Sequence, residues 1–256
     1  MLAQDEIVAR LRAAGCVFAE EEADLIIATA DSAAEVEWML ERRIGGDPLE
    51  HVLGWVEFCG NVLAVDPGVF VPRRRTELLV TAAVARCRPD AVVVDLCCGN
   101  GAIGASIAAA RPGVELHAAD IDPAAVACAR RNLAGIGTVH LGDFDAPLPA
   151  ELAGRVDVLV ANVPYVPTGA IPRMPAEARD HEPRIAFDGG PDGLDVLRRL
   201  MTAAPRWLTP GGHVLAEADE RQFDAAIDAV SAAGLQPEHQ LDEESGTLVV
   251  AGRLAE

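Results

Sequence analysis

The stretch Asn162-Val163-Pro164-Tyr165 follows an apolar run, residues 156–161, that we expect to form a strand. The side-chain carbonyl of Asn162 can accept a hydrogen bond from an NH2 group, and the backbone carbonyl of Val163 or Pro164 can accept a second. The ring of Tyr165 can stack on a flat group. The four residues therefore predict a site for a planar group that carries NH2, although a strand ending in a proline turn is also an ordinary loop.

A glycine-rich turn precedes this stretch in the sequence, at residues 95–101, which read DLCCGNG. Gly99 and Gly101 let the backbone turn tightly, so that a ligand can lie against the main chain and the free N–H groups of the following helix. Asp95 would repel a pyrophosphate, but it suits a cationic ligand such as the amino group of S-adenosylmethionine. The alternative is a purely structural turn, because short motifs match by chance.

Two further expected strands also end in acidic residues. Asp120 follows the run 114–119 and can accept hydrogen bonds from both hydroxyls of a ribose, with Ile121 beside it in the same predicted site. Asp122 precedes a proline and is better explained as a helix N-cap. At the third strand end, Asp143 or the backbone of Phe144 could meet the edge of an adenine. Acids at three successive strand ends favour a nucleoside-containing cofactor.

The elements that must position these residues alternate from residue 89 onward. The expected strands are 92–94, 114–119, 138–141, 156–161, 213–216 and 248–250, and the expected helices are 76–87, 103–110, 123–133, 194–207 and 223–233. Such alternation predicts an α/β fold with a parallel, doubly wound sheet. Ligands bind such sheets at the carboxyl ends of the strands, where the candidate residues fall.

The chain divides into three predicted regions. Residues 1–48 show apolar positions at helical spacing and predict a small helical domain that recognises the substrate. Residues 49–72 contain two β-prone runs around Gly60-Asn61 and predict a hairpin linker. Residues 73–256 form the α/β domain. Inside it, residues 166–191 are rich in proline, and we expect a long loop that gates the substrate.

Composition narrows the possible partners and location. The 256 residues carry a net charge of −19, and all 21 basic residues are arginine, so nucleic acid is an unlikely partner. No apolar run approaches the ~20 residues of a membrane span. Acids near the N-terminus do not fit a signal peptide, and we expect a cytoplasmic monomer. The six cysteines contain no CxxC pair, so no metal site is predicted.

Longer segments resemble the HemK/PrmC-type family, the protein-(glutamine-N5) methyltransferases that modify the Gly-Gly-Gln loop of peptide-chain release factors. Residues 47–80 resemble that family's hairpin and its FxPRPETE segment. The strings DLCCGNGAIG and AADIDPAAVACARRNL resemble its cofactor-binding half. NVPY resembles NPPY, which DNA and rRNA methyltransferases share, whereas the following HEPRIAFDGGPDGLDVLRRL is more specific to the family.

The resemblance implies a Rossmann-like, seven-stranded class I methyltransferase domain behind a small helical domain. It implies S-adenosyl-L-methionine as cofactor, S-adenosyl-L-homocysteine as product, and a protein or peptide glutamine as acceptor, with a release factor as the first candidate. Asn162 and Tyr165 would hold the target amide. The residues that would bind or border the cofactor are Thr76, Glu77, Asp95, Cys97, Gly99, Gly101, Asp120, Ile121, Asp143, Phe144 and Asn162.

The sequence departs from the family pattern at several positions and is short at its N-terminus. Cys97 stands where the family has a glycine, Arg74 and Arg75 stand for the Pro and Glu of PRPETE, and Val163 stands for the first proline of NPPY. Valine keeps its carbonyl but lacks the fixed φ of proline. Two alternatives therefore stay open: a methyltransferase for an exocyclic amine of nucleic acid, adenine N6 or guanine N2, and a cofactor-binding module that has lost catalysis.

Overall fold

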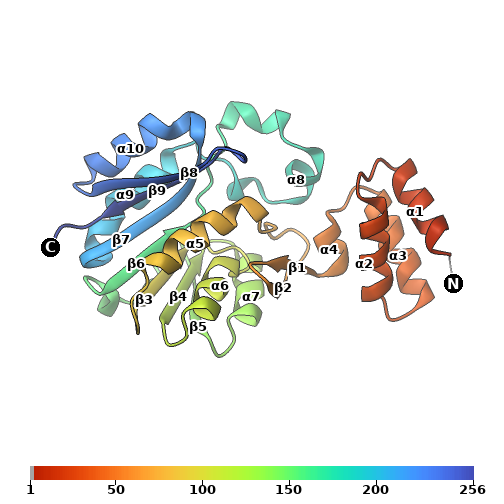
Figure 1. The fold of residues 1–256 in the computed structure, drawn as a ribbon, viewed down its shortest axis with the longest axis horizontal. Helices are drawn as coiled ribbons and strands as arrows, with labels where there is room; N and C mark the ends of the chain where they lie inside the picture. Colours follow the sequence, from red (N-terminus) through yellow and green to blue (C-terminus); the bar gives the residue numbers. More distant parts are fainter. Residues whose placement is uncertain (1–2) are drawn as a thin grey trace.

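The computed structural model describes residues 3–256, and its N-terminal helices lie at one end, apart from the sheet (Figure 1). These helices are α1 (Gln4–Ala13), α2 (Ala19–Thr29) and α3 (Ala33–Ile44). They pack around their own apolar core, in which Leu11, Ile26 and Leu40 are fully buried. Helix α3 begins where Ser32 accepts a hydrogen bond from the Glu35 N–H, an ordinary N-cap.

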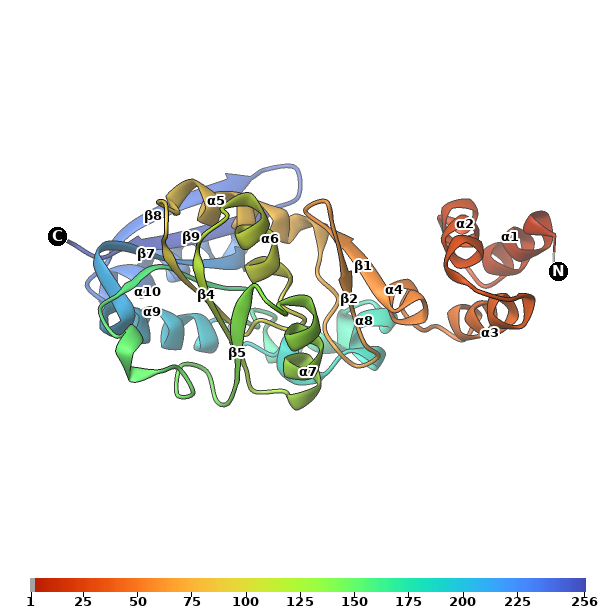
Figure 2. The same ribbon diagram turned by 90° about the horizontal axis from the view of Figure 1, so that it is seen from below.

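A short helix and a hairpin connect this bundle to the rest of the chain (Figure 2). They are α4 (Leu49–Leu53), β1 (Trp55–Phe58) and β2 (Asn61–Ala64), and the two strands pair antiparallel. Phe58 and Leu63 are buried in the same apolar layer as the helices on one face of the large sheet. The hairpin is therefore packed onto the α/β region rather than extended between two bodies.

The large sheet has seven strands in the order β5-β4-β3-β6-β7-β9-β8. Their bounds are β3 (Val92–Leu96), β4 (Glu115–Asp120), β5 (Gly137–Leu141), β6 (Val156–Ala161), β7 (Leu208–Asp219), β8 (Gln236–Asp242) and β9 (Thr247–Arg253). The central strands β3 and β6 are buried along their whole length. From β3 the chain adds β4 and β5 on one side and then β6 on the other side, so the strand order reverses between β3 and β6. This reversal places the carboxyl ends of β3, β4, β5 and β6 around one crevice.

The expected doubly wound fold is confirmed, but the sheet is not parallel at one edge. Strand β9 pairs antiparallel with both β7 and β8, and β8 was not predicted. The sequence of β8, QPEHQLD, is mostly polar and exposed, because an edge strand needs little apolar surface and tolerates proline. Its apolar pattern was therefore too weak to reveal it.

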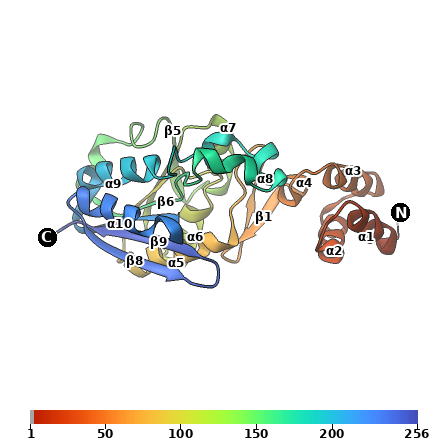
Figure 3. The same cartoon turned by 90° about the horizontal axis from the view of Figure 1, so that it is seen from above.

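Helices cover both faces of the sheet (Figure 3). One apolar layer includes α5 (Glu77–Arg86), α6 (Ala102–Ala110) and α7 (Pro123–Asn132). The other includes α9 (Asp195–Trp207) and α10 (Phe223–Ala232). Within residues 3–256, no helix is long and apolar enough to cross a membrane.

The segment expected to be a long loop, residues 166–191, is instead partly helical. It contains 3-10 turns at Thr168–Arg173 and Arg184–Ala186 and the helix α8 (Ala176–His181) between them. Prolines at the start of each piece, Pro167, Pro175 and Pro183, hid this structure in the sequence, because proline usually breaks regular elements but is well tolerated before and at the first turn of a helix.

Candidate active site

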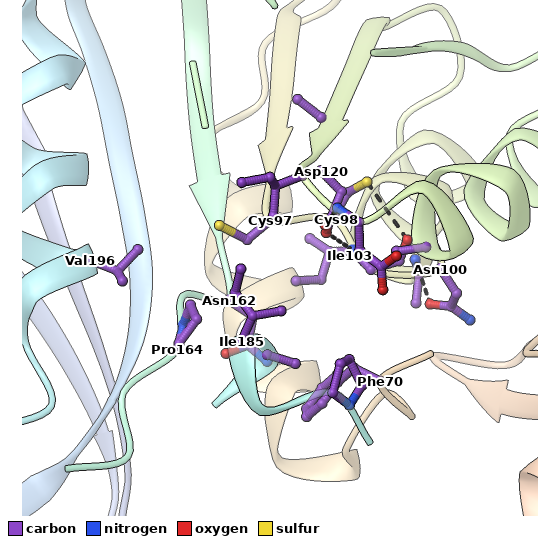
Figure 4. Close-up of a pocket in the computed structure, with 18 of the residues that line it drawn as sticks. Phe70, Cys97, Cys98, Asn100, Ile103, Asp120, Asn162, Pro164, Ile185 and Val196 are labelled. Atoms are coloured by element: carbon purple, nitrogen blue, oxygen red, sulfur yellow. Dashed lines mark hydrogen bonds between the residues drawn. The ribbon is translucent and has the colours of Figure 1, made fainter. Parts of the chain in front are cut away.

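A cavity opens at the carboxyl ends of β3, β4, β5 and β6 (Figure 4). Eight of the residues predicted to bind or border the cofactor line it, together with Pro164 from the predicted amide site. These eight are Thr76, Cys97, Gly99, Asp120, Ile121, Asp143, Phe144 and Asn162. Asp95, Gly101 and Glu77 do not line the cavity. Phe70, Ile185 and Val196 also line it and were not predicted, since apolar side chains carry no sequence signal for a site.

The glycine-rich turn after β3 is built from left-handed backbone. The φ angles are +53° at Cys97, +55° at Gly99 and +81° at Gly101. For Cys97 this conformation costs about 1–2 kcal/mol relative to glycine, which explains why the resembling family uses glycine there. A Cβ on Gly101 would lie 3.1 Å from the Leu133 side chain, so this glycine serves the close approach of α6 to α7.

Asp95 lies behind the turn rather than on the cavity wall. Its side chain is completely buried, and Oδ2 accepts a hydrogen bond from the Gly104 N–H at 2.9 Å. Within residues 3–256, no group is hydrogen-bonded to Oδ1. Burial raises the pKa of this carboxyl to about 7. Asp95 therefore anchors the first turn of α6.

Asp120, at the end of β4, both lines the cavity and holds the glycine-rich turn in place. Its Oδ2 accepts from the Gly99 N–H and its Oδ1 from the Asp122 N–H, each at 2.9 Å. Burial raises the pKa of this carboxyl. Each carboxylate oxygen can accept a further hydrogen bond, so both stay available to a ligand. The predicted N-cap is confirmed, because Asp122 accepts from the Ala124 N–H at the start of α7.

At the end of β5, Arg199 of α9 organises the predicted pair Asp143 and Phe144. Its Nη1 donates to Asp143 Oδ1 at 2.7 Å, which lowers the pKa of that carboxyl. The guanidinium lies over the Phe144 ring, 4.5 Å from its centroid. The sequence did not point to Arg199, because α9 is far from β5 in the chain.

The hairpin is bonded to the glycine-rich turn through asparagine side chains that were also missed. Asn132, at the end of α7, donates to the carbonyls of Ala64 and Asn100 at 2.9 and 2.8 Å, and its Oδ1 accepts from the Ala64 N–H at 2.9 Å. Asn100 also donates to the Ala64 carbonyl at 3.0 Å. These bonds fasten the end of β2 to the glycine-rich turn.

Asn162 stands at the end of β6 on the cavity wall (Figure 4). Its Nδ2 donates to the hydroxyl oxygen of the buried Thr76 in a long hydrogen bond of 3.4 Å. Within residues 3–256, no donor is bonded to the Asn162 Oδ1. The amide oxygen is therefore free to accept a hydrogen bond from a ligand.

A second groove adjoins the cavity and shares Asn162 with it. Its walls come from several parts of the molecule: Phe18 and Arg43 from the N-terminal region, Glu50 from α4 and, among others, Val163 and Tyr165 from the turn after β6. The structure thus places the four residues of the predicted amide site at the junction, with Asn162 and Pro164 on the cavity and Val163 and Tyr165 on the groove.

Two glycines of the later DGGPDGL segment let its backbone pack against this turn. A Cβ on Gly189 would lie 2.6 Å from the Pro164 carbonyl oxygen, and one on Gly193 would collide with the Tyr165 carbonyl oxygen. The Gly189 N–H also donates to the Val166 carbonyl at 2.9 Å. The spacing of glycines in this segment was a signal for such close approach, but the sequence alone did not show what approaches.

Comparisons with known proteins agree with this geometry. Residues 61–178 match the family model "Methyltransferase small domain". The chain is 41% identical to the release factor glutamine methyltransferase of Mycolicibacterium smegmatis, covering 78% of this chain and 71% of that protein. It is 40% identical to the enzyme of the same name from Moorella thermoacetica, covering 83% and 76%.

Solved structures show the same fold at low identity. A methyltransferase from Pyrococcus furiosus aligns with a TM-score of 0.57 at 16% identity, covering 76% of this chain and 89% of that one. A ribosomal protein L11 methylase from Lactobacillus delbrueckii subsp. bulgaricus aligns with a TM-score of 0.54 at 18% identity, covering 75% and 84%. The chain has the class I methyltransferase fold and belongs to the release factor glutamine methyltransferase family.

Proposed function

We propose that this protein transfers the methyl group of S-adenosyl-L-methionine to the side-chain amide nitrogen of a glutamine in a peptide-chain release factor. The observation that carries the proposal is the position of Asn162, which lines both the cavity and the groove. The relatives at 35–41% identity are named for this reaction. S-adenosyl-L-homocysteine would be the product left in the cavity.

The cavity fits such a cofactor by the chemistry of its walls. Asp120 provides carboxylate oxygens for ribose hydroxyls, the Gly99 turn leaves the main chain open, and Ile121 and Phe144 provide apolar surface for a base. When bound, the cofactor would supply an activated methyl group on a sulfonium centre. Cys97 and Thr76, the hydrogen-bond partner of Asn162, also line the cavity.

The protein's contribution to the chemistry is to hold a poor nucleophile. An amide nitrogen is unreactive because its lone pair is delocalised into the carbonyl. The Asn162 carbonyl and the backbone carbonyl of Val163 or Pro164 would accept both N–H bonds of the target amide, which returns electron density to the nitrogen and fixes its direction. Such positioning can lower a barrier by about 7–11 kcal/mol at its ideal limit. The proton can leave after methyl transfer, so no dedicated base is needed.

We propose that the protein substrate lies in the groove between the N-terminal helices and the α/β region. On this view residues 1–48 form a substrate-recognition domain, residues 49–72 a hairpin linker and residues 73–256 the methyltransferase domain. The groove carries both signs of charge, with Glu21, Glu50, Arg73 and Arg75 on its walls, which suits a protein loop better than a phosphate backbone. Action as a monomer in the cytoplasm belongs to the same proposal.

The test is to incubate the protein with isotopically labelled S-adenosylmethionine and the release factor of the same organism, and then to map the label by mass spectrometry. We expect one methyl group, on the glutamine of the Gly-Gly-Gln loop, and none on a release factor in which that glutamine is alanine. Label on RNA or DNA, with a steep dependence on salt, would support the nucleic-acid alternative instead. Cofactor binding without transfer to either class would support the non-catalytic alternative.

A further inference from the structure

A buried carboxylate outside the cavity contacts the turn that carries the amide site. Glu217 lies near the end of β7, and its side chain is only 1% exposed. Its Oε1 accepts from the Tyr165 hydroxyl at 2.7 Å and from Arg75 Nε at 3.1 Å. Within residues 3–256, no group is hydrogen-bonded to its Oε2. Burying such a charge is costly, so the arrangement is expected to serve more than stability.

Arg75 connects Glu217 to the same segment that orients Asn162. It belongs to the 3-10 turn Arg74–Thr76, so the adjacent residue is Thr76, the partner of the Asn162 amide. The Arg75 guanidinium also lies over the Tyr165 ring, 5.8 Å from its centroid. One short turn therefore contacts both ends of the stretch 162–165, through Thr76 at the first residue and Arg75 at the last.

The hydroxyl of Tyr165 is held as a donor to Glu217. Burial, and next the negative charge of Glu217, raise the pKa of the phenol well above its usual range. The backbone on the far side is fixed as well, because Gln222 Nε2 donates to the Tyr165 carbonyl at 3.0 Å. Val163 lies between Asn162 and these anchors. A proline at this position would fix φ, whereas valine does not.

We infer that Arg75 and Glu217 are positioning residues, which fix the turn after Asn162 through Tyr165 and so replace the rigidity that a proline at position 163 would give. Arg75 stands where the resembling PRPETE segment has glutamate, and a glutamate there would repel Glu217 rather than pair with it. The pair thus accounts for two departures of this chain at once. The inference rests on the proposed function for its kinetic tests and is independent of it in the spectroscopic test below.

The kinetic test compares Arg75→Gln, Tyr165→Phe and the double variant in methyl transfer to the release factor. Phenylalanine keeps the ring and removes only the hydroxyl. We expect each single change to lower kcat about tenfold without altering the Kd of S-adenosylmethionine, and the double variant to be no slower than the slower single one. Arg221→Gln, at an exposed arginine that bonds Asp219, is the matched control and should leave kcat unchanged. Unchanged kcat in the single variants, or losses that multiply in the double variant, would overturn the inference.

A sharper comparison introduces proline at position 163, as in the NPPY pattern. Val163→Pro combined with Tyr165→Phe should recover at least half of the wild-type kcat. A double variant that stays as slow as Tyr165→Phe would show that a proline at position 163 cannot replace the Tyr165 anchor, and would contradict the inference.

A spectroscopic test does not depend on the substrate, because Tyr165 is the only tyrosine of the chain. Labelling tyrosine with 13C at Cζ gives one NMR signal whose position reports the ionisation of this phenol. We expect the phenol of the wild-type protein to stay neutral above pH 10. In Glu217→Gln the phenol should titrate at a lower pH than in the wild type, whereas in the exposed control Glu220→Gln it should titrate as in the wild type. A wild-type phenol that titrates at the ordinary value, or a Glu217→Gln variant indistinguishable from it, would contradict the inference. If no release factor is methylated, the proposed function fails, but the NMR result still shows whether Glu217 holds the Tyr165 hydroxyl.

Discussion

Two acidic residues that look alike in the sequence have different surroundings in the structure. Asp95 is the penultimate residue of β3 and Asp120 the last residue of β4, and each stands just before a turn, so the sequence predicted both as ligands. The turn after β3 then folds over Asp95 and buries it against α6, whereas Asp120 lies on the cavity wall. The residue types at the strand ends could be predicted, but which of them faces the cavity depends on left-handed backbone at Cys97 and Gly99.

The burial of Asp95 predicts a particular dependence of stability on pH. The pKa of its carboxyl is about 7 in the folded protein and ordinarily 3.8, so between these values the folded state binds more protons than the unfolded state. Stability from this group therefore falls as pH rises from about 4 to about 7 and is level above that. Asp95→Asn has no carboxyl here and does not lose stability in this way. In thermal unfolding, the Tm of this variant minus the Tm of the wild type should therefore rise between about pH 4 and pH 7. A Tm difference that does not vary with pH would contradict the assignment.

At the scale of elements, the site depends on how closely the segment 187–193 packs against the turn after β6. The bonds from Val166 N–H to the Phe187 carbonyl and from Gly189 N–H to the Val166 carbonyl join the two backbones at 2.9 Å each. The helices and strands that carry the site were predicted within a few residues, because their apolar periodicity is strong. The packing of one loop on another was not, since it follows from main-chain contacts that leave no periodic pattern.

Gly189→Ala tests this packing. The new methyl group would meet the Pro164 carbonyl oxygen at 2.6 Å and the Gly193 carbonyl oxygen even closer, so the turn must move. A displacement on the order of 1 Å can cost ~100-fold in rate, and we expect kcat for methyl transfer to fall tenfold to a hundredfold at unchanged cofactor affinity. Gly169→Ala, in the 3-10 turn Thr168–Arg173, is the control, because no atom lies within 4 Å of the Cβ that it would add. Equal activity of the two variants would contradict this role.

At the scale of the whole molecule, ion pairs hold the N-terminal helices against the α/β region. Arg43 of α3 donates to Glu22 in its own bundle and to Glu177 of α8, both at 2.7 Å, and His181 of α8 lies 3.2 Å from Asp47. The sequence predicted the helical region and the α/β region separately. It could not place them, because the contacts that join them link residues more than a hundred positions apart.

Arg43→Met should weaken both the bundle and its contact with α8. The change leaves Glu22, whose side chain is 9% exposed, without its partner, and breaking a buried pair in this way costs about 3 kcal/mol. We expect a loss of that size in the unfolding of the helical region in urea, and a higher KM for the release factor with kcat little changed. Arg12→Met, which breaks an exposed pair with Glu20 in the same bundle, should cost less than about 1 kcal/mol. Equal losses of stability in the two variants would contradict the claim that the Arg43 contacts stabilise the protein more than an exposed ion pair does.

The measurement that tests the account most directly is single-turnover methyl transfer by Asn162→Ala. The change removes the carbonyl that would hold the target amide and leaves Asp120 and the glycine-rich turn intact. We expect the rate of transfer to the release-factor glutamine to fall by at least ~100-fold, equivalent to about 2.7 kcal/mol of barrier. The Kd of S-adenosylmethionine, measured by calorimetry, should stay within about twofold of wild type. A variant that transfers the methyl group at the wild-type rate would contradict the assignment of Asn162.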